Sequence, residues 1–461
     1  MTVSTRTERD FLGPLDIPAD RYYGIETQRA CRNFQITGVP IAAMPELIVA
    51  LAWVKKAAVR INRRAGDIDV ARAAAIEQAC DELLAGKHHD EFVVDVIQGG
   101  AGTSSNMNAN EVIANRALEI LNRPRGAYTV IHPKDDVNRC QSTNDVYATA
   151  IRLTVVQLNH RLIAAVQKCL RAFQERAGKF DGVQKLGRTQ LQDALPMTVG
   201  QELRAFAISL AEDVARLEET QPLLLEVNLG GTAIGTAVGV SDYYLGHIVP
   251  ELARVSGLAV TPAGDRIEAT WDTGIFVFYS GLLKRLATKL SKIANDLRLL
   301  SSGPFGGIGE LRLPEKQPGS SIMPGKVNPV IPEVVNQTCY RVFGADTTVT
   351  FAAESGQLQL NAMEPVILWS IYEATSSLIA AVETLVDNCI VGLEVNTERC
   401  GALLAASPAR ATTLARELGY GVAAEVALAM VRDGLSFEAA VQRVLPDTAN
   451  AVLASLASSG P

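Results

Sequence analysis

Residues 151–173 read IRLTVVQLNHRLIAAVQKCLRAF, and this stretch carries the strongest periodic signal in the chain. Its apolar residues recur every three or four positions, at Ile151, Val155, Leu158, Leu162, Val166, Cys169 and Phe173. A second apolar stripe runs beside the first, at Leu153, Val156, Ile163 and Leu170. Steps of three and four place side chains on one face of an α-helix. The stretch therefore predicts one long helix of about 30 residues with two apolar faces.

Other parts of the chain show the same periodicity. Further long helices are expected over 198–227, 276–300 and 365–391, and shorter ones over 46–63 and 69–85. A helix at the surface of a monomer cannot bury two apolar faces, so we expect a central bundle that also packs against other subunits. The sequence predicts a mainly α protein of three domains. These are a mixed, mainly helical domain at 1–142, the central bundle at 143–395 and a small helical domain at 396–461.

Composition excludes several classes of function. The 461 residues include 43 Lys and Arg against 50 Asp and Glu, a net charge of −7 without a basic block, which argues against a nucleic-acid partner. No apolar run reaches the roughly 18 residues of a transmembrane helix, and the N-terminus lacks the apolar core of a secretory signal. We therefore expect a cytoplasmic protein without a membrane partner. Seven scattered cysteines and five histidines form no ligand pattern, so no metal is expected, and the sequence offers no motif for another cofactor.

Three polar segments, 98–111, 138–145 and 319–329, interrupt the apolar pattern. They are rich in Gly, Ser, Thr and Asn, and each leads into a helical stretch. The N–H groups of a helix N-terminus, together with hydroxyl and amide donors, favour a bound carboxylate. Each segment alone also has an ordinary explanation. The first could be a dinucleotide-binding G-x-G after a strand at 92–97, the second an N-cap cluster, and the third a surface turn.

Taken together, the segments resemble the motifs of the aspartase/fumarase superfamily. The string GSSIMPGKVNP at 319–329 is similar to the signature loop of that superfamily almost letter for letter. Three further motifs are matched by GTSSNMNANE at 102–111, QSTND at 141–145 and GRTQLQD at 187–193. Within the superfamily the chain most resembles the aspartate ammonia-lyase branch, through IPAD at 17–20, YYGI at 22–25 and the threonine at 143.

The resemblance implies a homotetramer with a core of long helices and with active sites that are each assembled from three subunits. It also implies the reversible deamination of L-aspartate to fumarate and ammonia, in which a general base removes a Cβ proton and an aci-carboxylate intermediate forms. Ser320, on the catalytic loop 317–329, matches the general base of the family. The matching substrate contacts are Thr103, Ser142, Thr143 and Ser321 for the β-carboxylate, Lys326 and Asn328 for the α-carboxylate, and Thr189 and Asn144 near the amino group.

Gln190 separates the two main enzymatic functions within the superfamily. Fumarases carry His at the matching position, where it helps to protonate departing hydroxide, whereas ammonia leaves from an amine that is already protonated. Glutamine therefore favours ammonia release over class II fumarase chemistry. A lyase for another amino dicarboxylate and a structural protein that reuses the bundle stay as alternatives. Ala415 and Arg416 replace the Asn and Pro that are usual in aspartases, which leaves metal activation and allosteric response open.

Overall fold

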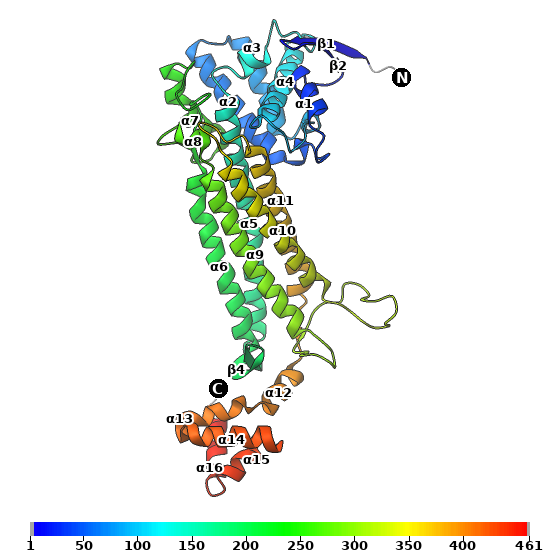
Figure 1. The fold of residues 1–461 in the computed structure, drawn as a ribbon, viewed down its shortest axis with the longest axis vertical. Coiled ribbons are helices and arrows are strands. Elements are labelled where there is room, and N and C mark those ends of the chain that lie inside the picture. Colours follow the sequence, from blue (N-terminus) through cyan, green and yellow to red (C-terminus); the bar gives the residue numbers. More distant parts are fainter. Residues whose placement is uncertain (1–3, 459–461) are drawn as a thin grey trace. The chain divides into compact units, whose positions relative to one another are not determined.

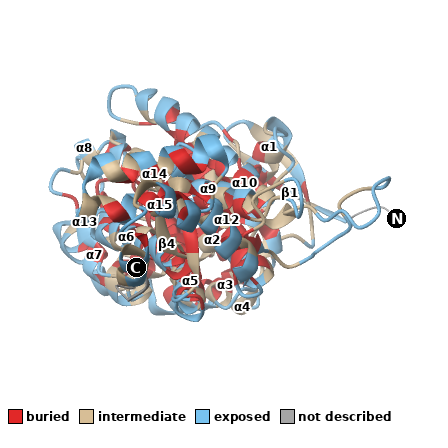
Figure 2. Cartoon of the chain, turned by 90° about the horizontal axis from the view of Figure 1, so that it is seen from below, coloured by how far each residue is buried: buried red, intermediate tan, exposed pale blue. Residues whose placement is uncertain are grey.

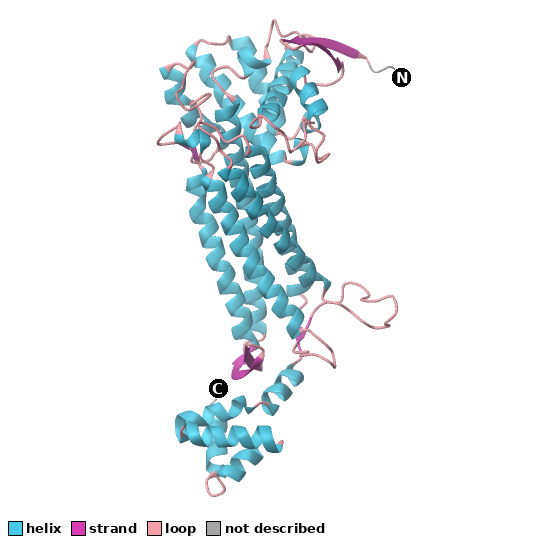
Figure 3. Cartoon of the chain, viewed as in Figure 1, coloured by secondary structure: helices cyan, strands magenta, loops and turns pink. Residues whose placement is uncertain are grey.

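The computed structural model describes residues 4–458, and most of them are helical (Figure 3). Within these residues the strands form four two-stranded sheets, of which only the third is parallel. The paired strands are β1 Thr5–Asp10 with β2 Gly13–Pro18, β3 Gln184–Thr189 with β4 Gln192–Thr198, β5 Glu226–Val227 with β6 Thr261–Pro262, and β7 Leu311–Arg312 with β8 Glu394–Val395. The predicted mainly α class is confirmed.

Five long helices form the framework of the chain (Figure 1). They are α5 Thr143–Lys179, α6 Val199–Leu224, α9 Gly274–Leu300, α10 Val330–Glu354 and α11 Glu364–Leu385. Four of them lie where the periodicity predicts long helices, and α5 begins at Thr143, ahead of the apolar stripe. The fifth, α10, follows the third polar segment, after which the sequence predicts a helix without giving its length.

Contacts between residues divide the chain into two compact units. Unit 1 comprises Met1–Ala164, Ala215–Ala287 and Tyr340–Ile379, and unit 2 comprises Ala165–Val214, Thr288–Cys339 and Ala380–Pro461. The division crosses all five long helices, so each unit contains a part of every one. The three-domain division with limits at 142 and 395 stays a prediction.

In unit 1 the long helices are joined by buried polar contacts. Asn159 on α5 donates from Nδ2 to the carbonyl of Leu217 on α6 at 3.0 Å, and Tyr279 on α9 donates from Oη to Asn159 Oδ1 at 3.4 Å. Unit 1 also contains shorter helices, namely α1 Ile25–Asn33, α2 Pro45–Ala65, α3 Val70–Leu84, α4 Thr103–Ile120, α7 Asp242–Ser256 and α8 Glu268–Trp271. Single helical turns accompany them at η1 Ile41–Ala43, η2 His89–Glu91 and η3 Pro133–Val137. The helices predicted at 46–63 and 69–85 are α2 and α3.

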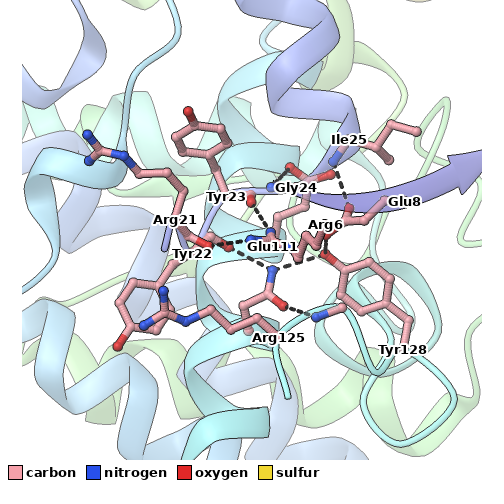
Figure 4. Close-up of polar contacts among 12 residues, drawn as sticks. Arg6, Glu8, Arg21, Tyr22, Tyr23, Gly24, Ile25, Glu111, Arg125 and Tyr128 are labelled. Carbon is pink, nitrogen blue, oxygen red and sulfur yellow. Dashed lines mark hydrogen bonds and ion pairs between the residues drawn. The ribbon is translucent and has the colours of Figure 1, made fainter. Parts of the chain in front are cut away.

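The carboxylate of Glu111 fixes α4 to the start of α1 (Figure 4). It accepts hydrogen bonds from the backbone N–H of Gly24 at 2.8 Å, and from the N–H and hydroxyl of Thr27 at 3.1 and 2.6 Å. A Cβ at Gly24 would lie 2.7 Å from Tyr128 Oη, so only glycine allows this close approach. Burial raises the pKa of Glu111 to about 7. This acid caps a helix, and its role is therefore structural.

Unit 2 contains the remaining parts of the long helices and the C-terminal helices. Phe173 on α5 packs edge-on against Phe206 on α6, with ring centroids 5.6 Å apart, and Asn336 on α10 donates to the carbonyl of Ser291 on α9 at 3.1 Å. The C-terminal elements are η4 Val386–Ile390, α12 Thr397–Ala406, η5 Pro408–Leu414, α13 Ala415–Leu418, α14 Tyr420–Asp433, α15 Phe437–Val444 and α16 Ala449–Ser458. A small core within residues 411–449 holds the last four helices together.

One stretch, Glu364–Ile390, is long and apolar enough to cross a membrane by length and composition alone, with a mean hydropathy of 1.4. The structure buries 67% of its most apolar window inside the protein. The helices in Figure 2 show buried and exposed faces side by side, which is the pattern of helices packed on one another. The stretch Glu364–Ile390 therefore has the character of a buried core helix.

Candidate active site

The ten predicted site residues fall into two groups. Unit 1 contains Thr103, Ser142, Thr143 and Asn144, and unit 2 contains Thr189, Gln190, Ser320, Ser321, Lys326 and Asn328. Each group is built on helix starts or tight turns, where backbone N–H groups are available to an anion.

Thr103 is the first residue of α4, and its side chain is exposed. The chain reaches it through Gly102, whose φ of +83° is in the left-handed region. A Cβ at Gly102 would lie 2.3 Å from the ring of Tyr147, so a larger residue would displace the helix start. The stretch 92–97 before this turn is irregular, with only an isolated bridge between Pro40 and Asp95. The strand that a dinucleotide-binding fingerprint requires is therefore absent from this described stretch.

The side chains of Ser142 and Asp145 both cap the start of α5. The N–H of Ser142 donates to Asp145 Oδ1 at 2.9 Å, and Ser142 Oγ accepts from the N–H of Asn144 at 3.3 Å. Asp145 Oδ2 also accepts from the N–H groups of Gly230 and Thr232, each at 3.0 Å. Burial raises the pKa of Asp145 to about 6, against the opposing effect of these N–H donors. The cap holds the Ser-Thr-Asn segment rigidly at the helix start.

Thr143 lies beside a buried set of amides. Asn106 donates from Nδ2 to Thr143 Oγ1 at 3.0 Å and to Asn138 Oδ1 at 3.2 Å. Lys55, which is fully buried, donates from Nζ to Asn138 Oδ1 at 2.8 Å and to Gln141 Oε1 at 3.0 Å. Burial lowers the pKa of Lys55 to about 7. Because Thr143 Oγ1 accepts from Asn106, the hydroxyl proton of Thr143 stays available for a carboxylate.

These supporting residues are missed by motif reasoning. Asn106 and Asn138 lie inside the polar segments, but no sequence feature assigns them a partner. Lys55 gives one usable signal, because it follows Leu51 by four residues and precedes Val59 by four, in the apolar register of α2. A charged side chain in such a register must find polar partners inside the protein.

The side chain of Asn144 donates a hydrogen bond from Nδ2 to the carbonyl of Ala233 at 2.7 Å. This contact turns its amide and leaves Oδ1 as an acceptor. An amide oxygen suits a protonated amine, which has only donors to offer. The predicted place of Asn144 near the amino group is compatible with this orientation.

Thr189 and Gln190 lie at the tip of the β3–β4 hairpin, and both are exposed. Thr189 pairs with Gln192, and the two residues between the strands, Gln190 and Leu191, have φ of +55° and +62°. Two consecutive left-handed residues form the type I′ turn that suits a two-residue hairpin. Such turns usually contain Gly or Asn, so this one keeps bulky side chains at a cost in backbone strain.

The loop between α9 and α10 carries the signature segment, and it is closed at a narrow neck (Figure 1). The N–H of Gly319 donates to the carbonyl of Lys326 at 2.7 Å, and Asn328 Nδ2 donates to the carbonyl of Gly319 at 2.9 Å. A Cβ at Gly319 would lie 2.7 Å from the Lys326 oxygen, so glycine is required at this position. Asn328 therefore has a role in loop closure, and one amide hydrogen is left for a ligand.

Ser320 lies just inside the neck and is half-buried, whereas Ser321 and Lys326 are exposed. Its Oγ accepts from the backbone N–H groups of Ile322 and Met323, each at 3.2 Å. Hydrogen bonds from two N–H groups stabilise negative charge on an oxygen, as in an oxyanion hole. The loop backbone thus places two N–H donors at the oxygen of Ser320.

Among residues 4–458, no group of three or more His, Cys, Asp and Glu side chains is arranged to hold a metal ion. The expectation that the chain needs no metal and no cofactor stays a prediction. The described site residues offer hydroxyls, amides, backbone N–H groups and one lysine. This donor set fits a small dicarboxylate.

Comparison with known proteins places the chain among lyases. The sequence profile of a family described as "Lyase" matches residues 13–344. A protein named aspartate ammonia-lyase from Pseudomonas canavaninivorans is 54% identical over 432 residues, which are 94% of this chain and 91% of that protein. A protein with the same name from Escherichia coli strain K12 is 52% identical over 401 residues, 87% of this chain and 84% of that protein.

Solved structures with the same fold also match over nearly the whole chain. A protein described as fumarate lyase:delta crystallin from Brucella melitensis, bound to cobalt, has a TM-score of 0.96 and 52% identity, covering 99% of this chain and 100% of that one. A class II fumarase from Schistosoma mansoni has a TM-score of 0.92 and 31% identity, covering 96% and 95%. The predicted aspartase/fumarase-like fold is therefore confirmed.

Proposed function

Because the chain belongs to this family of lyases, we propose that it is a carbon–nitrogen lyase that converts L-aspartate reversibly to fumarate and ammonia. The identity of 50% or more to several aspartate ammonia-lyases, over most of both chains, supports this substrate. The mechanism rests on the residues described above. It begins with removal of a proton from Cβ, beside the β-carboxylate.

Ser320 is the base in this mechanism, and the observation that carries the proposal is the pair of N–H donors at its Oγ. A serine hydroxyl is rarely ionised in water, so its negative form needs fixed donors around it. The N–H groups of Ile322 and Met323 are such donors, and the cationic Lys326 lies on the same loop. The proton passes from Cβ to Ser320 Oγ, and the electron pair left behind spreads onto the β-carboxylate.

The β-carboxylate gains charge in this step, so its contacts decide the rate. Thr103, Ser142, Thr143 and Ser321 are proposed to hold it. Because Thr143 Oγ1 accepts from Asn106, the Thr143 hydroxyl proton is free to donate to this carboxylate. Lys326 and Asn328 are proposed to bind the α-carboxylate, and Thr189 and Asn144 to face the amine. Collapse of the aci-carboxylate then expels ammonia.

We also propose a homotetramer whose sites are each shared by three subunits. Large apolar side chains are exposed on the long helices of unit 1, among them Phe278 at 52%, Tyr340 at 56% and Phe351 at 68% exposure. Exposed aromatic side chains on rigid helices are typical of a surface that another subunit covers.

A cytoplasmic location is part of the proposal. All seven cysteines are unpaired thiols in the structure, and five of them are buried. Proteins that keep many free thiols are typical of reducing compartments.

The experiment that tests the function compares two substrates that differ only in the leaving group. Purified protein is incubated with L-aspartate and with L-malate while the absorbance of fumarate is followed. We expect aspartate to be converted and malate to react about 10²- to 10⁴-fold more slowly, because the amide of Gln190 cannot protonate departing hydroxide. Comparable kcat/KM for both substrates would favour a fumarase. Inactivity with both, in an intact tetramer, would point to another amino dicarboxylate.

A further inference from the structure

A β-bulge lies directly behind the turn that carries Thr189 and Gln190. The pairing of β3 with β4 shifts register between Leu186 and Arg188, where Ala194 and Leu195 of β4 lie opposite the single residue Gly187 of β3. A Cβ at Gly187 would lie 2.8 Å from the carbonyl oxygen of Leu195, so the bulge depends on glycine. In a regular strand, residues three apart point to opposite faces. Lys185 and Arg188, both on β3 opposite the bulge, nevertheless reach the same carboxylate.

That carboxylate belongs to Glu310, whose side chain is fully buried. Lys185 Nζ lies 2.9 Å from Glu310 Oε2, and Arg188 Nη1 lies 2.9 Å from Glu310 Oε1. Lys185 also pairs with Glu202, on α6, at 2.6 Å. Two cations and two anions therefore balance inside unit 2. Lys185 and Glu310 are both buried, and separating buried opposite charges is costly, so these ion pairs tie the hairpin to Glu310.

Glu310 is joined through its backbone to the stem of the catalytic loop. Its carbonyl accepts from the N–H of Asn396 at 2.8 Å, and β7, which begins at Leu311, pairs with β8. The chain leaves β7 at Arg312 and continues into the segment with Ser320. One residue thus connects the hairpin of Thr189 with the anchored start of the loop that carries the proposed base.

We propose that Glu310 is a positioning residue for the amine side of the active site. Its ion pairs with Lys185 and Arg188 hold the bulged hairpin in the one arrangement that directs Thr189 and Gln190 toward the departing amine. This inference rests on the proposed function and assigns the control of ammonia to a residue outside the motifs at 102–111, 141–145, 187–193 and 319–329. Gln190 and Leu191 both have strained left-handed φ values, so their turn depends on a rigid support.

The ion pair has a second consequence, for specificity. Arg188 immediately precedes Thr189, and its guanidinium could attract a substrate carboxylate if it were not held. Glu310 keeps Arg188 engaged inside the protein. Carboxylate recognition is thereby left to Lys326 and the hydroxyls, and the hairpin tip contacts the amine alone.

The test uses Glu310→Gln, which keeps the shape of the side chain and removes its charge. The matched control is Glu202→Gln, which removes the other anion beside Lys185 without touching Arg188. The variants are assayed in the amination direction, with fumarate and ammonia varied separately. We expect Glu310→Gln to raise KM for ammonia about 10-fold or more and to leave KM for fumarate nearly unchanged, because fumarate has both carboxylates but no amine. Glu202→Gln should change neither constant more than about 2-fold.

A second measurement does not depend on activity. Backbone hydrogen exchange should become faster at 189–192 in Glu310→Gln than in the wild type, and should stay unchanged there in Glu202→Gln. If Glu310→Gln does not fold, Arg188→Gln breaks the same contact from the hairpin side and should give the same rise in KM for ammonia. A lower kcat with both KM values unchanged, or unchanged exchange at 189–192, would overturn the proposal. Wild-type protein that is inactive on aspartate would refute the proposed function, while the exchange measurement would still decide the role of Glu310.

Discussion

At the scale of single residues, the hydroxyl of Ser320 and its two N–H partners form the chemical centre of the proposed reaction. The interaction lies within one short loop, so it does not depend on the packing of any helix. The side chain is half-buried and contributes no core contact. Chemistry and stability are therefore separable at this position.

Replacing Ser320 by Ala is expected to lower kcat for aspartate by about 10²- to 10⁴-fold, because the only proposed base is lost. The melting temperature should stay within about 2 °C of the wild type, since no apolar contact or helix cap is removed. Steady-state kinetics and thermal unfolding check both statements. A variant that keeps most of its activity would show that the base lies elsewhere.

Glu364, at the start of α11, gives a prediction about pH. It is buried, its Oε2 has no hydrogen-bond partner among residues 4–458, and burial raises its pKa to about 8, with Arg152 as the opposing influence. A raised pKa means that the folded state prefers the protonated acid. The protonated Glu364 side chain therefore stabilises the folded state fully below pH 4.5, and this stabilisation is lost as the pH rises through 8.

In Glu364→Gln the free energy of unfolding should therefore depend less on pH between 5 and 8, by up to about 1.4 kcal/mol per pH unit. Urea unfolding at several pH values, at one protein concentration, measures this slope. Glu354→Gln, which changes an exposed carboxylate on α10, is the control and should leave the slope as it is. Equal slopes in all three proteins would show that Glu364 is charged in the folded state.

At the scale of elements, the turn before α4 offers a paired comparison of two glycines. Gly100 and Gly102 both have positive φ, of +92° and +83°. A Cβ at Gly100 would find nothing closer than 3.8 Å, whereas one at Gly102 would lie 2.3 Å from the Tyr147 ring. Gly100→Ala should thus lower the free energy of unfolding by about 1 kcal/mol, through backbone strain alone. Gly102→Ala should lower it by several kcal/mol and should also reduce activity, because Thr103 moves. Equal stabilities of the two variants would disprove the steric argument.

The long helices could be predicted from the sequence because their apolar periodicity is local information. The same holds for the capped start of α5, where Ser142 and Asp145 lie three residues apart. The hairpin turn could not be predicted, since Gln190 and Leu191 are neither of the residue types that usually mark a type I′ turn. Glu310 was equally hidden, because its partners Lys185 and Arg188 are more than 100 residues away and become neighbours only through the fold. Sequence motifs thus predict candidate substrate contacts more readily than the residues that support them.

At the scale of the whole molecule, the exposed aromatic side chains predict that the chain associates with other subunits. Phe351 on α10 is 68% exposed in the single chain. If the proposed tetramer covers this face, Phe351→Arg is expected to place an unpaired charge in a subunit interface and to give smaller species without activity. Sedimentation velocity and an aspartate assay on the same samples check this. Glu425→Arg, an exposed change on α14, serves as the control, and a stable Phe351→Arg tetramer would place the interface on other surfaces.

The neck between Gly319 and Lys326 has a thermodynamic consequence. The hydrogen bond between Gly319 and Lys326 joins the two ends of the loop in the folded protein. Most of the conformational entropy of this loop is therefore lost on folding and not on ligand binding. Little additional ordering is then required when Ser320 settles over a substrate. A small dicarboxylate provides only a modest binding free energy. Because little of that free energy is spent on ordering the loop, it can be used to lower the reaction barrier.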